Sequence, residues 1–115
     1  MLSLLAALIL LTTPTTPTLY VKLSTYNPAL GGVNCGAWDA ETGTCTSRTA
    51  SGQRWQDWTG KGLACPSQFA MWTRFVIDGQ VWTCIDRGGW IVCHDKPGEG
   101  YHCHLDLLTE YHRLS

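Results

Sequence analysis

Six cysteines in a chain of 115 residues limit the folds that this sequence can adopt. A domain of this size buries a modest core, and exported domains commonly use disulfides to supplement it. Six cysteines allow fifteen pairings, so the sequence alone does not determine their connectivity. We expect two bonds that close short loops and a third that joins two predicted strands. The expected disulfides are Cys35–Cys45, Cys65–Cys84 and Cys93–Cys103.

A zinc site is the alternative use of these cysteines. The sequence contains no Cys-x-x-Cys motif, and its densest cluster of metal-binding residue types is His102-Cys103-His104. In an extended strand His102 and His104 share one face, while Cys103 points to the other. The pattern is more typical of two histidines on a strand surface, so we expect no metal and no cofactor.

The N-terminal segment has the composition of a targeting sequence. Residues 2–11 are apolar apart from Ser3, and these ten residues match the ~7–15 of a signal-peptide core but not the ~20 that span a membrane. Pro14 and Pro17 would interrupt a helix. No basic side chain precedes the run, and no Ala-x-Ala cleavage site follows it. An uncleaved membrane tether and an incorrectly assigned start codon are therefore the alternatives. We predict residues 1–18 as a signal peptide or tether, and an extracellular or cell-envelope location.

Charge and length restrict the class of function. Lys and Arg total 8 against 9 Asp and Glu, which gives a net charge of −1. Domains that bind nucleic acid usually carry a basic stripe, so we expect no nucleic-acid partner. The length fits one domain after the leader, which we assign to residues 19–115. We expect a monomer whose only membrane contact would be an uncleaved N-terminal segment.

Short alternations of apolar and polar residues predict a mainly β domain. Asp78-Gly79 separates two such runs and is typical of a type I′ hairpin turn. Residues 29–62 show little periodicity, and so long a connection is expected to be functional or held by a disulfide. The predicted strands cover residues 20–26, 62–65, 73–77, 80–85, 90–93 and 101–105.

The C-terminal segment 107–114 has a helical pattern. Its apolar residues recur at positions i, i+1, i+4 and i+7, which is the spacing of a short amphipathic helix. Asp106 precedes this segment and is a residue type that caps helix N-termini. We therefore predict a short C-terminal helix with Asp106 as its N-cap.

Several short motifs occur in an order found in one known group of domains. They are Thr25-Tyr26, Thr49-Ala50-Ser51-Gly52, Ala64, the 73–85 hairpin, Asp86-Arg87-Gly88-Gly89-Trp90-Ile91 and Leu105-Asp106-Leu107. Over residues 23–114 the chain resembles six-stranded double-psi β-barrels. The group includes the rare-lipoprotein-A-like domains, the three-aspartate (3D) domains and MltA-type lytic transglycosylases; expansins and family 45 endoglucanases share the barrel. The resemblance implies a mainly β, six-stranded double-psi β-barrel with disulfide-stapled loops.

The resemblance also implies a site that acts on polysaccharide. Asp106 matches the aspartate that the transglycosylases use as acid and base, Asp86 matches its partner aspartate, and Thr25 matches a threonine lining the same groove. Two features depart from the group. The stretch 63–66 lacks the third aspartate, and the link between Asp86 and Asp106 is longer, since it contains the predicted Cys93–Cys103 arm.

One acid suffices for the reaction that the resemblance implies. Simple hydrolysis of a glycosidic bond needs two carboxylates with opposed roles. A lytic transglycosylase instead uses the sugar's own 6-hydroxyl as nucleophile, so one group serves as acid and then as base. Asp106 would have to hold a proton at rest, which burial and an ionised Asp86 would favour, whereas a helix N-cap position would oppose it.

Six tryptophans are many for a small domain. Exposed indole rings can stack on the C–H faces of sugars. Trp55 and Trp58 lie in the polar 29–62 segment, and Trp90 follows the glycine pair beside Asp86. We assign these three and Arg87 as candidate substrate-binding residues, and the chain as a secreted cell-wall-active protein that cleaves peptidoglycan. A non-catalytic, expansin-like polysaccharide-binding module and an extracellular protein-binding domain are the alternatives.

Overall fold

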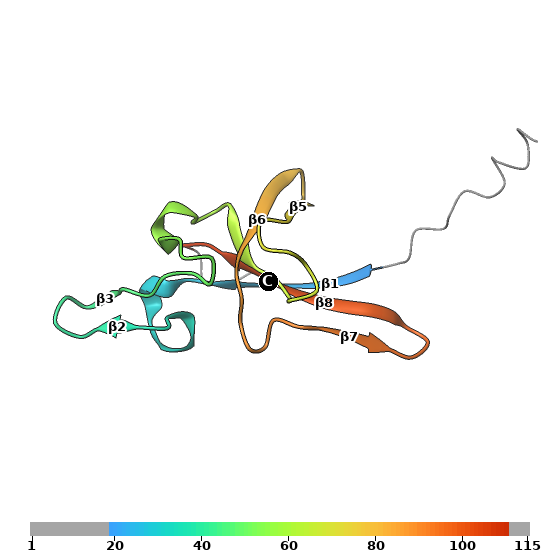
Figure 1. Cartoon of the computed structure of the whole chain (residues 1–115), viewed down its shortest axis with the longest axis horizontal. Coiled ribbons are helices and arrows are strands. Elements are labelled where there is room, and N and C mark those ends of the chain that lie inside the picture. The colour runs from blue at the N-terminus through green and yellow to red at the C-terminus, as the bar shows by residue number, and fades with distance from the viewer. Residues whose placement is uncertain (1–18, 111–115) are drawn as a thin grey trace, which may run out of the picture.

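The computed structural model describes residues 19–110, and this part of the chain is mainly β (Figure 1). The predicted leader and residues 111–114 of the predicted helix lie outside the described residues. The strands are β1 (Leu19–Tyr26), β2 (Trp38–Asp39), β3 (Thr44–Cys45), β4 (Gly62–Ala64), β5 (Arg74–Ile77), β6 (Gln80–Asp86), β7 (Cys93–Lys96) and β8 (Gly100–Leu108). Short 3₁₀ helices are η1 (Pro28–Leu30), η2 (Gly32–Asn34) and η3 (Trp55–Asp57).

Six of these strands form one sheet in the order β1-β8-β4-β6-β5, and β7 also pairs with β8. The longest ladder joins β1 and β8, which run parallel from Leu19↔Tyr101 to Tyr26↔Leu108. Since β1 covers one edge of β8 along its length, the other edge is shared by β7 at its start and β4 near its end. β7 and the first half of β8 project from the body as an arm, opposite the small β2–β3 hairpin (Figure 1).

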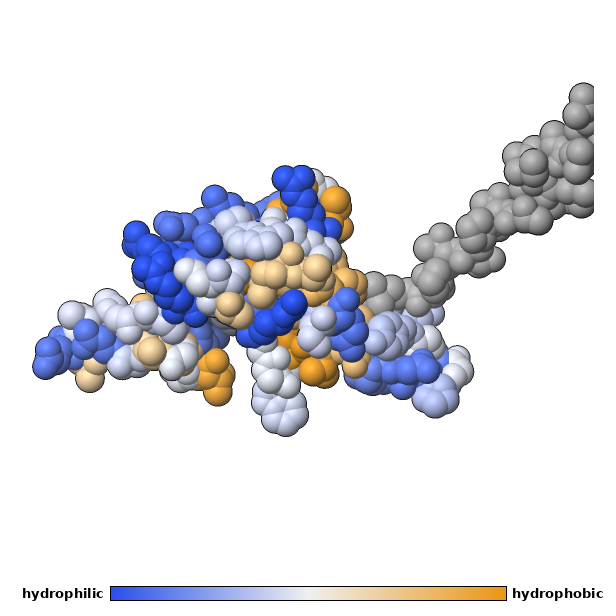
Figure 2. Space-filling view, in the orientation of Figure 1, coloured by the Kyte–Doolittle hydropathy of each residue, from blue (hydrophilic) through white to orange (hydrophobic). Residues whose placement is uncertain are grey.

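One face of this sheet carries the hydrophobic core. Leu105 and Leu107 alternate along β8 and are 2% and 4% exposed. They pack with Leu63, Trp82 and the Cys65–Cys84 disulfide, and partly buried aromatic and aliphatic side chains from residues 69–77 cover the cluster. Elsewhere, hydrophobic side chains also reach the surface at the β5–β6 end of the molecule (Figure 2).

The three disulfides have the predicted connectivity. Cys35–Cys45 holds η2 against the β2–β3 hairpin, and Cys93–Cys103 joins directly paired residues of β7 and β8. Cys65–Cys84 joins the end of β4 to β6 within the core. Three disulfides are compatible with an extracellular protein. Within residues 19–110, no helix has the length and hydrophobicity needed to cross a membrane.

The β5–β6 hairpin is confirmed, including its turn. Asp78 and Gly79 have φ values of 50° and 77°, the left-handed values that a type I′ turn requires. The ladder runs from Arg74↔Thr83 to Ile77↔Gln80, so the turn consists of the two predicted residues.

Two predicted elements are wrong. The helix expected from residue 107 does not begin there, because Leu107 and Leu108 continue β8 and pair with β1. Asp106 is therefore a mid-strand residue and not a helix N-cap. The strand expected at 90–93 begins only at Cys93; Trp90 lies in a turn, where the Ile91 amide donates to the Gly88 carbonyl.

The sheet has two ends in the strand order, β1 and β5. Among residues 19–110 no ladder joins these two strands. The six-stranded sheet is thus established, whereas its closure into a double-psi barrel stays a prediction.

Candidate functional site

Four neighbouring strands place one residue each in a row that contains both candidate acids. Ser24 on β1 pairs with Asp106 on β8, Asp106 pairs with Ala64 on β4, and Ala64 pairs with Asp86 on β6. Directly paired residues point to the same side of a sheet. The row therefore lies on one face, opposite Leu105 and Leu107. We call this surface the polar face.

An irregularity in the β4–β6 ladder determines where Asp86 points. Leu63 pairs with Cys84, but the next residue, Ala64, pairs with Asp86 and not with Ile85. One extra residue in a strand changes the face on which the following side chains lie. Cys84 faces the core, and under regular pairing, with Ile85 opposite Ala64, Asp86 would face it as well. The irregularity thus brings Asp86 to the polar face, beside small Ala64.

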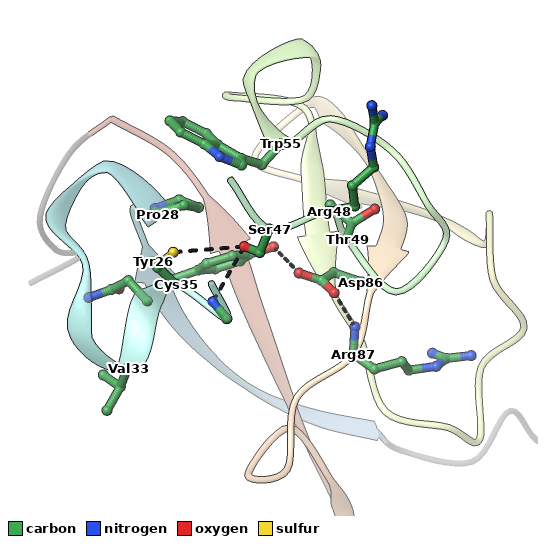
Figure 3. Close-up of a pocket in the computed structure, with 12 residues that line it drawn as sticks. Tyr26, Pro28, Val33, Cys35, Ser47, Arg48, Thr49, Trp55, Asp86 and Arg87 are labelled. Carbon is green, nitrogen blue, oxygen red and sulfur yellow. Dashed lines mark hydrogen bonds between the residues drawn. The ribbon is translucent and has the colours of Figure 1, made fainter. Parts of the chain in front are cut away.

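Hydrogen bonds occupy both carboxylate oxygens of Asp86 (Figure 3). Oδ1 accepts from the backbone amides of Ala50 at 2.8 Å and Arg87 at 2.9 Å, and Oδ2 accepts from the Tyr26 hydroxyl at 3.0 Å. Burial, and then the charge of Asp86, raise the pKa of Tyr26 well above its usual value, so Tyr26 stays a neutral donor. Asp86 thus accepts three hydrogen bonds, two at Oδ1 and one at Oδ2.

Asp106 is half-buried and accepts fewer hydrogen bonds than Asp86 does. Burial raises the pKa of its carboxyl, and the negative charge of Asp86 raises it further. The Ser24 hydrogen bond and nearby His104 act in the opposite direction without reversing the shift. Oδ1 accepts from the Ser24 hydroxyl at 2.7 Å, whereas Oδ2 has no hydrogen bond within the described residues. Burial therefore makes Asp106 hold its proton more tightly than an ordinary aspartic acid does.

The raised pKa of Asp106 predicts a pH-dependent term in stability. A carboxyl whose pKa is higher in the folded chain stabilises the fold fully below its unfolded pKa of 3.8, and this term is lost as the pH rises through the folded pKa. Relative to Asp106→Asn, the wild-type free energy of unfolding should therefore fall as the pH rises from about 3 through the folded pKa. Urea denaturation of both proteins across this range measures the difference. A difference that rises with pH would mean that folding lowers this pKa.

Two hollows lie on either side of Asp106 along β8. The first has a volume of about 240 Å³, and Tyr26, Trp55 and Asp86 are among its lining residues (Figure 3). The second, of about 210 Å³, is lined by residues that include Lys22, Trp90 and His104. Tyr26 lies two residues after Ser24 on β1, and Lys22 lies two residues before it. We call these the Tyr26 hollow and the His104 hollow; Asp106 lies between them.

The predicted tryptophans occupy three different environments. Trp55 lines the Tyr26 hollow, and its indole N–H donates to the Cys45 carbonyl. Trp58 packs against Trp72 and donates to Gln53, so it supports the loop and does not line either hollow. Trp90 is 89% exposed and lines the His104 hollow. The structure thus brings Trp55 and Trp90 to the two hollows, and Trp58 to neither.

Thr25 and Arg87 do not direct their polar groups to the carboxylates. Thr25 pairs with Leu107, so it lies on the core side of β1, where its Oγ1 is buried without a hydrogen-bond partner within residues 19–110. The Arg87 guanidinium donates to the carbonyls of Cys65, Pro66 and Phe69 at 2.8–3.0 Å. Figure 3 shows it pointing away from the Tyr26 hollow. Arg87 holds the turn after β4, and only its backbone amide contacts Asp86.

Three residues of the site were not among the candidates, namely Ser24, Tyr26 and His104. Each contacts one of the acids directly or through one side chain. A signal for them exists in the sequence, since residues that alternate along the first and last predicted strands share a face. His104 lies two residues before Asp106, but Ser24 and Tyr26 could be placed only with the β1–β8 register.

Comparison with known proteins does not place the chain in a family. No family model matches it, and no curated protein or solved structure is significantly similar to it. Within residues 19–110, no group of three His, Cys, Asp or Glu side chains is arranged to hold a metal ion. The chemistry of the site must therefore be argued from its own geometry.

Proposed function

We propose that this chain is an exported, cell-wall-active protein that cleaves glycan strands of peptidoglycan as a lytic transglycosylase does, with Asp106 as acid and base. The observation that carries the proposal is the position of Asp106. It is a half-buried carboxyl whose pKa is raised by burial, and it lies between two hollows on one face of the sheet. A double-psi barrel is the fold that we propose for the sheet.

The reaction uses one proton twice. Protonated Asp106 gives its proton to the bridging glycosidic oxygen as the bond from that oxygen to C1 breaks. The Asp106 carboxylate then takes the proton of the muramic acid 6-hydroxyl as O6 bonds to C1. The product is a 1,6-anhydro sugar, and Asp106 is protonated again. Because the nucleophile belongs to the substrate, proximity takes the place of a second base.

The environment of Asp86 favours this reaction over simple hydrolysis. A hydrolase needs a second carboxylate that can activate water or attack the sugar. Both oxygens of Asp86 already accept hydrogen bonds from Tyr26 and two backbone amides. Asp86 can therefore raise the pKa of Asp106 and stabilise a developing positive charge, but three of its roughly four acceptor positions are already used.

Product analysis tests the proposal. Purified peptidoglycan is incubated with the folded, disulfide-bonded protein, and the soluble fragments are analysed by mass spectrometry. We expect 1,6-anhydro ends, which are one water lighter than the ends that hydrolysis produces. Reducing ends alone would replace the transglycosylase proposal with hydrolysis, and no fragments at all would contradict catalysis on this substrate.

A non-catalytic glycan-binding module is the second candidate. The observation that favours it is the open nature of the site, because Trp90 is 89% exposed at the rim of the His104 hollow. Such a module would bind the same glycan without releasing fragments. Sedimentation with insoluble peptidoglycan, together with the product analysis, separates the two functions.

Under either function, Trp90→Ala should weaken glycan binding. The side chain is almost fully exposed, so its removal should cost little stability but remove a stacking surface. We expect a loss of affinity of about tenfold, which corresponds to ~1.4 kcal/mol. Titration with soluble muropeptides, followed by indole fluorescence, measures this loss of affinity.

Trp38→Ala is the matched control. It changes a half-exposed tryptophan on the β2–β3 hairpin and should bind as the wild type does. Equal affinities of Trp90→Ala and wild type would remove Trp90 from the site.

A further inference from the structure

A chain of hydrogen bonds leads away from Asp106 along the polar face. The Ser24 hydroxyl lies 2.7 Å from Asp106 Oδ1 and 2.6 Å from His104 Nε2. The other ring nitrogen, His104 Nδ1, lies 3.2 Å from the backbone carbonyl oxygen of Trp90. The contacts connect β1, two positions of β8 and the turn before β7. Ser24 Oγ is the only bridge between the carboxyl and the imidazole in this chain of contacts.

The geometry restricts how many hydrogens the polar atoms of Asp106, Ser24 and His104 can carry together. A carbonyl oxygen only accepts, so His104 Nδ1 must carry a hydrogen. The Ser24 hydroxyl has one hydrogen and can donate it to Asp106 or to Nε2, but not to both. If it donates to Asp106, Nε2 must carry a hydrogen, and His104 is a cation. If it donates to Nε2, Asp106 must be protonated, and His104 is neutral. Both arrangements contain one proton more than a carboxylate and a neutral imidazole.

We propose that Asp106, Ser24 and His104 form a proton relay that holds one shared proton. In one direction the Asp106 O–H bond breaks as its proton passes to Ser24 Oγ, while the Ser24 proton passes to His104 Nε2; the reverse transfer returns a proton to Asp106. No proton is gained or lost by the three residues together. Ser24 is a positioning residue, and His104 stores the proton. The relay's role in glycan cleavage rests on the proposed function, whereas the relay itself does not.

Charged groups flank the relay at both ends. Lys22 pairs with His104 and lines the same hollow. Asp86, on the other side, disfavours a negative Asp106. Ala64, the β4 residue opposite Asp106, contributes no charge. Other titratable groups on this face include Tyr26, which donates to Asp86, the stacked rings of Tyr20, His102 and His94, and Lys96, which lines the His104 hollow.

Titration by NMR tests the relay on the intact protein without substrate. We propose to follow the Asp106 carboxyl carbon and the His104 ring nitrogens across the pH range. Residues that share a proton titrate with common apparent pKa values, so both signals should move in the same two steps. In Ser24→Ala the bridge is lost, and each group should titrate in a single step of its own. Ser24→Thr keeps a hydroxyl and should preserve the common steps.

Further readouts separate the relay from a structural effect of the mutation. His94 lies outside the hydrogen-bond chain, so its titration should be the same in all three proteins. Single, unrelated steps for Asp106 and His104 in the wild type, unchanged in Ser24→Ala, would overturn the relay. Common steps in a protein that releases no glycan fragments would support the relay and contradict the proposed function. Release of glycan fragments without common titration steps would support the proposed function and contradict the relay.

Discussion

Asp106→Asn is expected to lower the release of 1,6-anhydro fragments by about 10²–10⁴-fold, the contribution typical of a general acid–base group. Asparagine has nearly the same shape as aspartic acid and can still contact Ser24, but it cannot donate a proton to a glycosidic oxygen or accept one from a hydroxyl. The substitution removes the acid and leaves the strand pairing intact. Fragment release from purified peptidoglycan measures the effect, and thermal unfolding shows that the variant is folded.

Asp78→Asn is the matched control for this experiment. It makes the same chemical change in an exposed carboxylate at the tip of the β5–β6 hairpin, where asparagine also suits a left-handed φ. This variant should release fragments at the wild-type rate. A folded Asp106→Asn protein with full activity would contradict the role of Asp106, whatever the fate of the relay.

Removing the Cys65–Cys84 disulfide by a double alanine substitution is expected to lower the free energy of unfolding by about 3–5 kcal/mol. The bond links residues 19 positions apart, and both cysteines are fully buried in the core. Its loss enlarges the conformational freedom of the unfolded chain and also removes two sulfur atoms from the packed cluster. The Arg87 guanidinium donates to the carbonyl of Cys65, so the turn that it holds should loosen as well.

The double substitution Cys35→Ala/Cys45→Ala provides the comparison. That bond closes a shorter segment of 10 positions beside the β2–β3 hairpin, away from the core cluster. We expect a smaller loss, of about 2 kcal/mol, because the entropic contribution is lower and the core packing is unchanged. Urea denaturation of the two variants gives both values. A larger loss for the hairpin bond would show that the core does not depend on Cys65–Cys84.

Local sequence signals were sufficient for much of the fold. Asp78-Gly79 predicted the β5–β6 hairpin because two consecutive left-handed residues suit few other turns. The alternation of residues 20–26 predicted β1, and the expected disulfides have the observed connectivity. The turn and the disulfides join residues close in sequence, whereas β1 pairs with β8, some eighty residues later.

The two errors have different physical origins, one in non-local pairing and one in a local turn. The Leu107-Leu108 doublet fits a helix as well as a strand, and the ladder with β1, some eighty residues earlier, decides for the strand. Trp90 was expected in a strand because its neighbours are apolar, but the return of Ile91 toward Gly88 forms a turn. The ladder with β1 cannot be read from the local pattern, whereas the turn is local and was hidden by the apolar run that follows Gly89.

The candidate site shows the same division. Asp86 and Asp106 were singled out by their motifs, and the register across β6, β4 and β8 brings them to one face. The roles of their neighbours were not readable. Nothing in the sequence indicates that Arg87 would donate to three carbonyls, or that Ser24 would contact both Asp106 and His104.

The single residue by which β6 outruns β4 makes the position of Asp86 depend on strand register as well as on residue type. Were β6 to slip by one residue, so that Ile85 lay opposite Ala64, the Asp86 carboxylate would turn toward the leucines beneath the sheet. Both acidic residues would still be present in the sequence, yet they would no longer share a face. The pairing of β4 beyond Leu63 therefore decides whether two aspartates so far apart in sequence can act on one ligand.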